Sequence, residues 1–170
     1  FKFNPITDST IVAVNDLPTY GVDTSVFGGA VYAFNEKIYL VPRAHTHIVE
    51  FDPLTATWKN VGINLGSSVG KFAKGSLLPN GKILITPLSD NRLILFDPFD
   101  YSIQVVANLT GYYGSVLNSK GDVILTPLEA TATKIYVYKS GISLNSSDCV
   151  FPSNLADLPT SNYNKYFNKF

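Results

Sequence analysis

An internal repeat is the feature that most limits how this chain of 170 residues can fold. Three segments share one order of residue types: a glycine with small or apolar neighbours, a polar turn, an apolar run that ends in proline, and a further apolar run. A period of about 40 residues is typical of repeat architectures, in which each unit buries its apolar face against the next. The marker prolines Pro42, Pro87 and Pro127 lie 45 and 40 residues apart. We therefore predict three equivalent units, at residues 27–62, 72–107 and 112–145.

Each unit is predicted to begin with a hairpin of two strands. In the second unit, Asn80-Gly81 lies between two short apolar runs, which favours a tight turn because both residue types tolerate positive φ. Gly121 in the third unit and residues 35–37 in the first occupy the same place. The run that follows, residues 83–85 in the second unit, is continuously apolar. Such a strand is expected to be covered on both faces.

A third and a fourth strand are predicted to complete each unit. The third strand ends in Asp-Pro in the first two units, where the aspartate caps a turn and the proline presets φ. A weaker fourth strand follows at residues 57–61 and 102–106. Four antiparallel strands in each period describe one blade of a β-propeller, so the predicted fold is all-β with about three four-stranded antiparallel blades. The turn residues that define this pattern are Asn80, Gly81, Gly121, Asp52, Pro53, Asp97 and Pro98.

The repeats resemble those of β-propellers of the kelch and galactose-oxidase-like type. The features that carry the resemblance are Gly28-Gly29, the Asn-Gly-Lys-Ile sequence at 80–83, the Phe-Asp-Pro sequences and Trp58, which closes the first unit. Similar Asn-Gly-Lys-Ile repeats are found in lyases of the virginiamycin B type and in surface and virion appendage proteins. The resemblance covers roughly residues 1–145 and implies a propeller architecture. Only the first unit has the Gly-Gly pair and the tryptophan.

The two ends of the sequence predict an incomplete ring. Phe3-Asn4-Pro5 matches Phe51-Asp52-Pro53, so residues 1–26 are expected to hold the outer strands of a half blade and a connection. Three repeats follow in 27–150, and residues 151–170 show no hairpin pattern and are interpreted as an extended arm. Typical propellers have four to eight blades. We therefore expect another segment or another chain to complete the ring.

Composition argues against several classes of function. Thirteen basic and thirteen acidic side chains cancel, and no basic run is available to neutralise phosphates, so nucleic-acid binding is not expected. No apolar stretch has the length of a membrane-spanning helix. The single cysteine, Cys149, excludes an internal disulfide framework and a cysteine-based zinc site. Two sequons make Asn108 and Asn145 candidates for glycosylation, which would fit a secreted protein.

The chain contains few candidates for catalysis or metal binding. His45 and His47 would lie on one face of a strand and could form half a metal site. Their place in the repeat is a polar turn, which favours exposed turn histidines. A galactose-oxidase-like copper centre needs two His, two Tyr and a Cys crosslinked to one Tyr, but the single cysteine, Cys149, lies in the weak C-terminal region. A virginiamycin-type lyase needs a cluster of His, Glu and metal-binding carboxylates, whereas acids such as Asp52 and Asp97 belong to turns. We therefore predict no catalytic, cofactor or metal residues and no enzymatic activity.

The leading hypothesis is a non-enzymatic propeller module for binding or assembly, in an extracellular, surface-appendage or virion structure. The expected partner is a protein, either a second copy or the remainder of the same precursor. One alternative is a carbohydrate-binding propeller that presents the turns 43–47 and 89–92 to glycans. Another is part of a propeller lyase or oxidase whose active site lies mostly outside this chain.

Two groups of apolar residues are expected to mediate the association. A face of the third unit should need a neighbouring blade to cover it. We expect this face to consist of Val123, Ile124, Leu125, Ile135 and Val137. Aromatic residues near the two ends suit an arm that docks on a neighbour. These interaction-arm candidates are Phe1, Phe3, Tyr163, Tyr166, Phe167 and Phe170.

Overall fold

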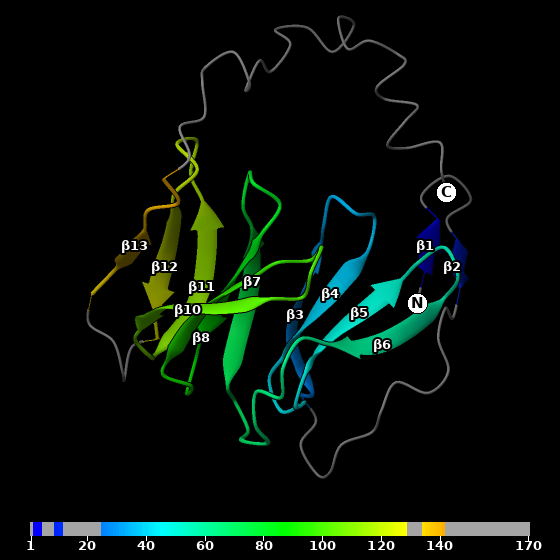
Figure 1. Ribbon diagram of the computed structural model, residues 1–170, viewed down its shortest axis with the longest axis horizontal. Coiled ribbons are helices and arrows are strands. Elements are labelled where there is room, and N and C mark those ends of the chain that lie inside the picture. Colours follow the sequence, from blue (N-terminus) through cyan, green and yellow to red (C-terminus); the bar gives the residue numbers. More distant parts are fainter. Residues whose placement is uncertain (1, 5–8, 12–24, 129–133, 142–170) are drawn as a thin grey trace, which may run out of the picture. The chain divides into compact units, whose positions relative to one another are not determined.

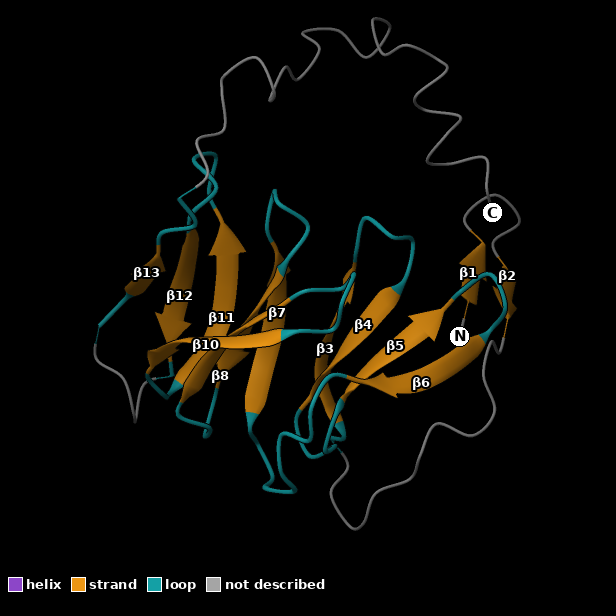
Figure 2. Ribbon diagram, viewed as in Figure 1, coloured by secondary structure: helices purple, strands orange, loops and turns teal. Residues whose placement is uncertain are grey.

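The structure, a computed structural model, describes residues 2–4, 9–11, 25–128 and 134–141 (Figure 1). These residues form thirteen strands and no helix, which confirms the all-β prediction (Figure 2). Consequently no helix in this part of the chain is long and apolar enough to cross a membrane. The chain divides into two compact units, one of Phe1–Asn15 with Leu144–Phe170 and one of Asp16–Ser143.

The larger unit contains three antiparallel sheets, which we name blades A, B and C. In each blade the strands follow one another in chain order. Blade A consists of β3 (Phe27–Tyr32), β4 (Ile38–Pro42), β5 (Ile48–Asp52) and β6 (Thr57–Val61). Blade B consists of β7 (Phe72–Leu77), β8 (Ile83–Pro87), β9 (Arg92–Phe96) and β10 (Ile103–Asn108). Blade C consists of β11 (Tyr112–Leu117), β12 (Val123–Pro127) and β13 (Tyr136–Tyr138).

Three sheets in chain order agree with the predicted repeats. The first two blades have the four strands expected, whereas blade C has three among the described residues. Its fourth strand was expected near residues 142–144, which lie outside the described part of the chain. In the smaller unit, β1 (Lys2–Asn4) pairs with β2 (Ser9–Ile11) in an antiparallel hairpin. Its interpretation as the outer half of a blade stays a prediction.

The register of the strands is the same in all three blades. Each first strand begins with an aromatic residue that pairs with the marker proline, and a bulge follows directly. The three pairs are Phe27 with Pro42, Phe72 with Pro87 and Tyr112 with Pro127. The strands β3, β7 and β11 contact one another in sequence and lie side by side in Figure 1. They are therefore the inner strands, and the later strands of each blade lie further out.

The hairpin between the first and second strands has a residue with positive φ in every blade. Gly81 and Gly121 have φ of 84° and 81°, and the side-chain oxygen of Asn80 accepts a hydrogen bond from the backbone of Lys82. In blade A the same position is occupied by Glu36, with φ of 62°. Because a β-carbon disfavours this conformation, blade A pays a steric cost that blades B and C avoid.

Replacing Glu36 by glycine is expected to stabilise the fold by up to about 1 kcal/mol, because glycine adopts positive φ without steric strain. Replacing Gly81 by valine should have the opposite effect and cost roughly 1 kcal/mol or more. Urea unfolding followed by circular dichroism measures both changes. Equal midpoints for the two variants would contradict the turn assignment.

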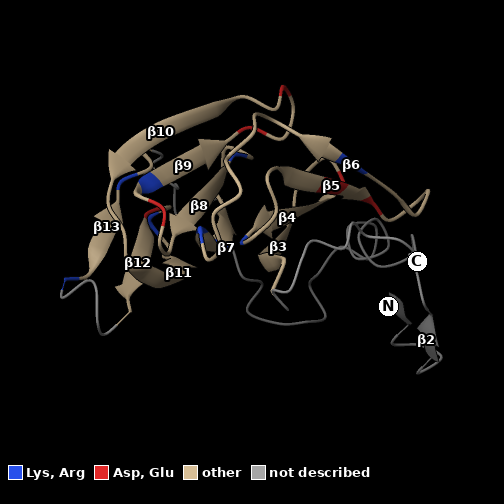
Figure 3. Cartoon of the chain, turned by 90° about the horizontal axis from the view of Figure 1, so that it is seen from below, with Lys and Arg blue, Asp and Glu red and all other residues tan. Residues whose placement is uncertain are grey.

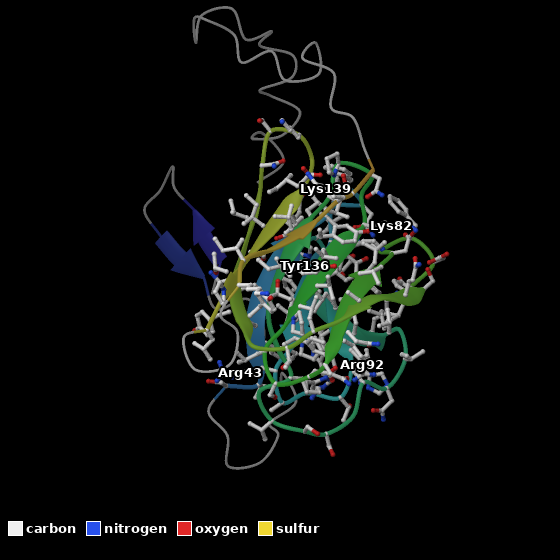
Figure 4. All side chains as sticks on the ribbon, turned by 90° about the vertical axis from the view of Figure 1, so that its left-hand side faces the viewer. Arg43, Lys82, Arg92, Tyr136 and Lys139 are labelled. Carbon is white, nitrogen blue, oxygen red and sulfur yellow. The ribbon has the colours of Figure 1, made fainter. Side chains whose placement is uncertain are left out.

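An ion pair joins the start of the second strand to the end of the third strand in every blade. The pairs are Lys37 with Asp52 at 2.5 Å, Lys82 with Asp97 at 3.3 Å, and Asp122 with Lys139 at 2.9 Å. The signs are exchanged in blade C, so the two positions carry opposite charges in all three blades. Figure 4 shows Lys82 and Lys139 near one end of the blades, whereas Arg43 and Arg92 lie near the other.

Candidate interaction surface

Alternate residues of each second strand contact different neighbouring blades. In β8, Ile83 and Ile85 pack in the core between blades A and B, whereas Leu84 packs in the core between blades B and C. All three are at most 1% exposed. Blade B is therefore covered on both faces, as its continuously apolar second strand predicted.

Blade C shows the same alternation, but only one of its faces contacts another blade. Val123 and Leu125 pack against blade B and are fully buried. The prediction placed these two residues on one face with Ile124, Ile135 and Val137. That prediction was wrong for Val123 and Leu125, because successive side chains of a strand point to opposite sides of the sheet.

The other face of blade C is exposed and apolar. Val116, Ile124 and Val137 are direct cross-strand neighbours on β11, β12 and β13, and they share this face. Ile135 lies two residues before Val137, at the position that Leu93 occupies in blade B. We call this set of four residues, Val116, Ile124, Ile135 and Val137, the blade C open face.

A comparison with the equivalent positions in blade B shows that the open face of blade C lacks a neighbouring blade. Leu95 pairs with Leu84 in blade B exactly where Val137 pairs with Ile124 in blade C. Leu95 is 9% exposed and Val137 is 41% exposed. Leu93 is fully buried, whereas Ile135 is 66% exposed. In blade B, Leu93 and Leu95 are covered by blade C. On blade C, no other described blade covers the equivalent residues Ile135 and Val137.

A buried polar cluster joins blades A and B. Glu50, in the middle of β5, is 7% exposed, and its Oε2 accepts hydrogen bonds from the hydroxyls of Tyr39 at 2.8 Å and Tyr101 at 2.9 Å. Its Oε1 lies 3.2 Å from Nζ of Lys59, which also donates to the Tyr101 hydroxyl. Since Tyr101 belongs to blade B, the carboxylate of blade A holds the two blades together.

The surroundings of Glu50 favour its ionised form. Burial alone would raise its pKa, but the hydrogen bonds from Tyr39, Tyr101 and Lys59 outweigh burial and hold the pKa below its usual value. Burial also raises the pKa of the Tyr39 hydroxyl, which therefore keeps its proton. Both oxygens of the carboxylate are occupied by these donors, so the cluster acts as a link between blades.

The sequence analysis missed this cluster because it treated the acidic residues as turn residues. Asp52 and Asp97 do lie at turns, where each accepts a hydrogen bond from the backbone two residues later. Glu50 differs, since it lies between apolar neighbours within a strand. A charged residue inside an apolar strand was the pattern that could have revealed it. In the cartoon of Figure 3 the strands are mostly tan, so charged residues occupy little of them.

The expectation of exposed histidines was wrong for His45, which is fully buried. The residues do form a bend, but the His45 ring packs 5.3 Å from the ring of Phe27, and its Nδ1 lies 3.1 Å from the backbone nitrogen of His47. Burial lowers the pKa of His45. The two imidazole rings are 6.4 Å apart at their centroids. Among the described residues, no group of three or more His, Cys, Asp or Glu could hold a metal ion.

In the second turn suggested for glycan binding, the two charged side chains bind each other and the backbone. Asp90 forms an ion pair of 2.6 Å with Arg92, whose guanidinium also donates to the backbone carbonyl of Leu65. Hydrogen bonds from Arg92 outweigh the effect of burial and lower the pKa of Asp90. These contacts attach the segment between blades A and B to blade B.

Other sites suggested by the sequence lie in different parts of the chain. Asn108 is exposed at the end of β10, and its sequon threonine, Thr110, donates a hydrogen bond to the backbone of Leu88. Phe3 lies in β1. The remaining candidates, which are Phe1, Asn145, Tyr163, Tyr166, Phe167 and Phe170, lie outside the described residues.

Three antiparallel blades with adjacent inner strands define an all-β, propeller-like protein. No protein-family model matches the chain. No curated protein matches it in sequence either. The fold is similar to that in the crystal structure of selenomethionine-substituted virginiamycin B lyase from Staphylococcus aureus, with a TM-score of 0.51 and 15% identity. The match covers 71% of this chain and 44% of that chain, so this chain spans less than half of the lyase.

This similarity corrects the prediction about enzymatic activity and supports only the coarser part of the predicted resemblance, which is the propeller-like fold. The prediction that the chain is not an enzyme is contradicted, because the solved structure with the similar fold is a lyase. That prediction rested on the absence of catalytic motifs from the sequence, and the absence of a motif does not exclude an enzyme. The comparison supports a propeller-like fold and does not confirm the kelch type. At 15% identity it shows the fold alone.

Proposed function

We propose that this chain is a β-propeller segment that functions by associating with further propeller blades, in an extracellular, surface-appendage or virion assembly. The observation that supports this function is the blade C open face. Ile135 and Val137 are 66% and 41% exposed there, at positions where blade B is buried by its neighbour. Exposed apolar patches of this kind mark interaction sites in soluble proteins.

The energetics favour a partner for this face. Burying an aliphatic side chain such as that of Ile135 contributes about 1.5–3 kcal/mol relative to leaving it in water. The face extends across the three strands of blade C, so a second sheet can pack on it as blade C packs on blade B. The exposed sequon residue Asn108 is compatible with a glycosylated, extracellular protein.

The first test is the mass of the purified chain in solution, measured by light scattering during size-exclusion chromatography at micromolar concentration. We expect a species larger than one chain, since association buries the open face. A well-folded monomer over the whole concentration range would contradict association between copies of this chain.

A second candidate function is catalysis by a propeller enzyme of the virginiamycin B lyase type. The similarity of fold to that lyase supports this candidate, and the covered share of 44% implies that other residues would complete the site. Isothermal titration of virginiamycin B into the chain, with product analysis by mass spectrometry, tests it. The candidate predicts measurable binding. The absence of both binding and turnover would contradict it.

A further inference from the structure

A series of backbone hydrogen bonds passes from blade to blade at the end of the sheets where the marker prolines lie. In each blade, the residue after the proline donates its N–H to the carbonyl of the residue just before the inner strand. The bonds are Arg43 to Val26 at 3.0 Å, Leu88 to Lys71 at 2.8 Å and Leu128 to Gly111 at 2.7 Å. In each blade, this bond joins the end of the second strand to the start of the inner strand.

The same residues connect neighbouring blades. The N–H of Lys71, before the inner strand of blade B, donates to the carbonyl of Arg43 in blade A at 3.0 Å. The N–H of Gly111 donates to the carbonyl of Leu88 in the same way, at 2.8 Å. By this rule the carbonyl of Leu128 is the acceptor for a blade that follows blade C. Val26 lies before the inner strand of blade A, at the position of Lys71 and Gly111. Its N–H is therefore the matching donor to a blade that precedes blade A.

We propose that a second copy of this chain docks head to tail on blade C, with its blade A against the blade C open face and its Val26 N–H donating to the Leu128 carbonyl. This proposal rests on the proposed function and names the partner and the surface. It extends the contacts already made between blades A and B and between blades B and C.

The side chains of blade A suit this role. On the face of blade A turned away from blade B, Ile38, Leu40 and Phe51 occupy the positions of Ile83, Ile85 and Phe96, with which blade B contacts blade A. All three are half-buried. Tyr32, which pairs with Ile38, is 53% exposed on the same face. Blade A therefore offers apolar residues of the kind that already pack against a preceding blade.

A head-to-tail contact satisfies more groups than a symmetric contact between two open faces. The symmetric contact would bury the apolar side chains of both copies, but it would place two Leu128 carbonyls, and no Val26 N–H, at the interface. The head-to-tail contact buries one open face against the apolar side chains of blade A, and it continues the hydrogen-bond series. Two copies joined in this way at both ends would form a ring of six blades, within the usual range of four to eight.

The first part of the test changes the open face and measures mass by light scattering. The wild-type chain is expected to be a dimer, and the double variant Ile135→Asp/Val137→Asp a monomer with an unchanged circular dichroism spectrum. The control is Val105→Asp, since Val105 is 47% exposed in β10 of blade B, which takes no part in the proposed contact. It should leave the dimer intact. A monomeric wild type would overturn both this proposal and self-association.

The second part tests the direction of docking. Val26→Cys and Leu128→Cys are made separately in a Cys149→Ser background, and one of them carries an added tag that changes its mass. Mixing the two variants with a short bismaleimide is expected to give mixed cross-linked dimers in high yield, while each variant alone gives few. An oligomer without the mixed product would overturn head-to-tail docking, yet leave association itself in place.

Discussion

Replacing Gly28 by alanine is expected to lower the free energy of unfolding by roughly 3 kcal/mol, at the upper end of the cost of overpacking a core. A β-carbon at Gly28 would lie 2.5 Å from the carbonyl oxygen of Ala73 and 2.6 Å from that of Phe72. Both atoms belong to the backbone of β7, so they cannot move aside as a flexible side chain could. The inner strands of blades A and B would have to separate.

The neighbouring glycine provides a matched control. A β-carbon at Gly29 would have its closest neighbour, the Ala73 carbonyl oxygen, at 3.7 Å, which is an ordinary van der Waals distance. Gly29→Ala should therefore change stability by less than about 1 kcal/mol. Urea unfolding of the two variants measures the difference. Similar losses at both positions would show that the close approach of β3 and β7 is not what excludes a side chain at Gly28.

Replacing Glu50 by glutamine is expected to cost about 1–3 kcal/mol at pH 7, because a charged acceptor buried between two blades is lost. The tyrosine hydroxyls can still donate to the glutamine oxygen, but Lys59 loses its ionic partner. The measurement is again urea unfolding, with Asp100→Asn as a control, since that exposed carboxylate serves a turn within blade B. A variant as stable as the wild type would show that the cluster does not fasten blade A to blade B.

The same substitution makes a prediction about pH. The pKa of Glu50 is lower in the folded protein than its usual value near 4.5, so the folded state favours the ionised form. Its contribution is complete above the pKa of the unfolded chain and is lost as pH falls through the lower folded value. The difference in stability between wild type and Glu50→Gln should thus be constant above about pH 5 and should shrink at more acidic pH. A difference that grows on acidification would contradict the assignment.

The proline period determined the number and order of the blades. Prolines end strands because they cannot donate to a ladder, and Asn-Gly turns prescribe hairpins through positive φ. These are local effects of single residues, so they can be read without knowing what lies nearby. The continuously apolar run at residues 83–85 predicted a strand covered on both faces, again from the residues of that strand alone.

Only the tertiary structure decided which residues meet. Whether Ile124 or Val123 faces a neighbour depends on the register of β12 against β11 and β13, and a shift of one residue would exchange them. The burial of His45 against Phe27 and the cluster at Glu50 likewise join segments from different strands. Local pattern determines which strands form, whereas the packing of sheets determines which side chains are buried, because burial depends on neighbours that are distant in the sequence.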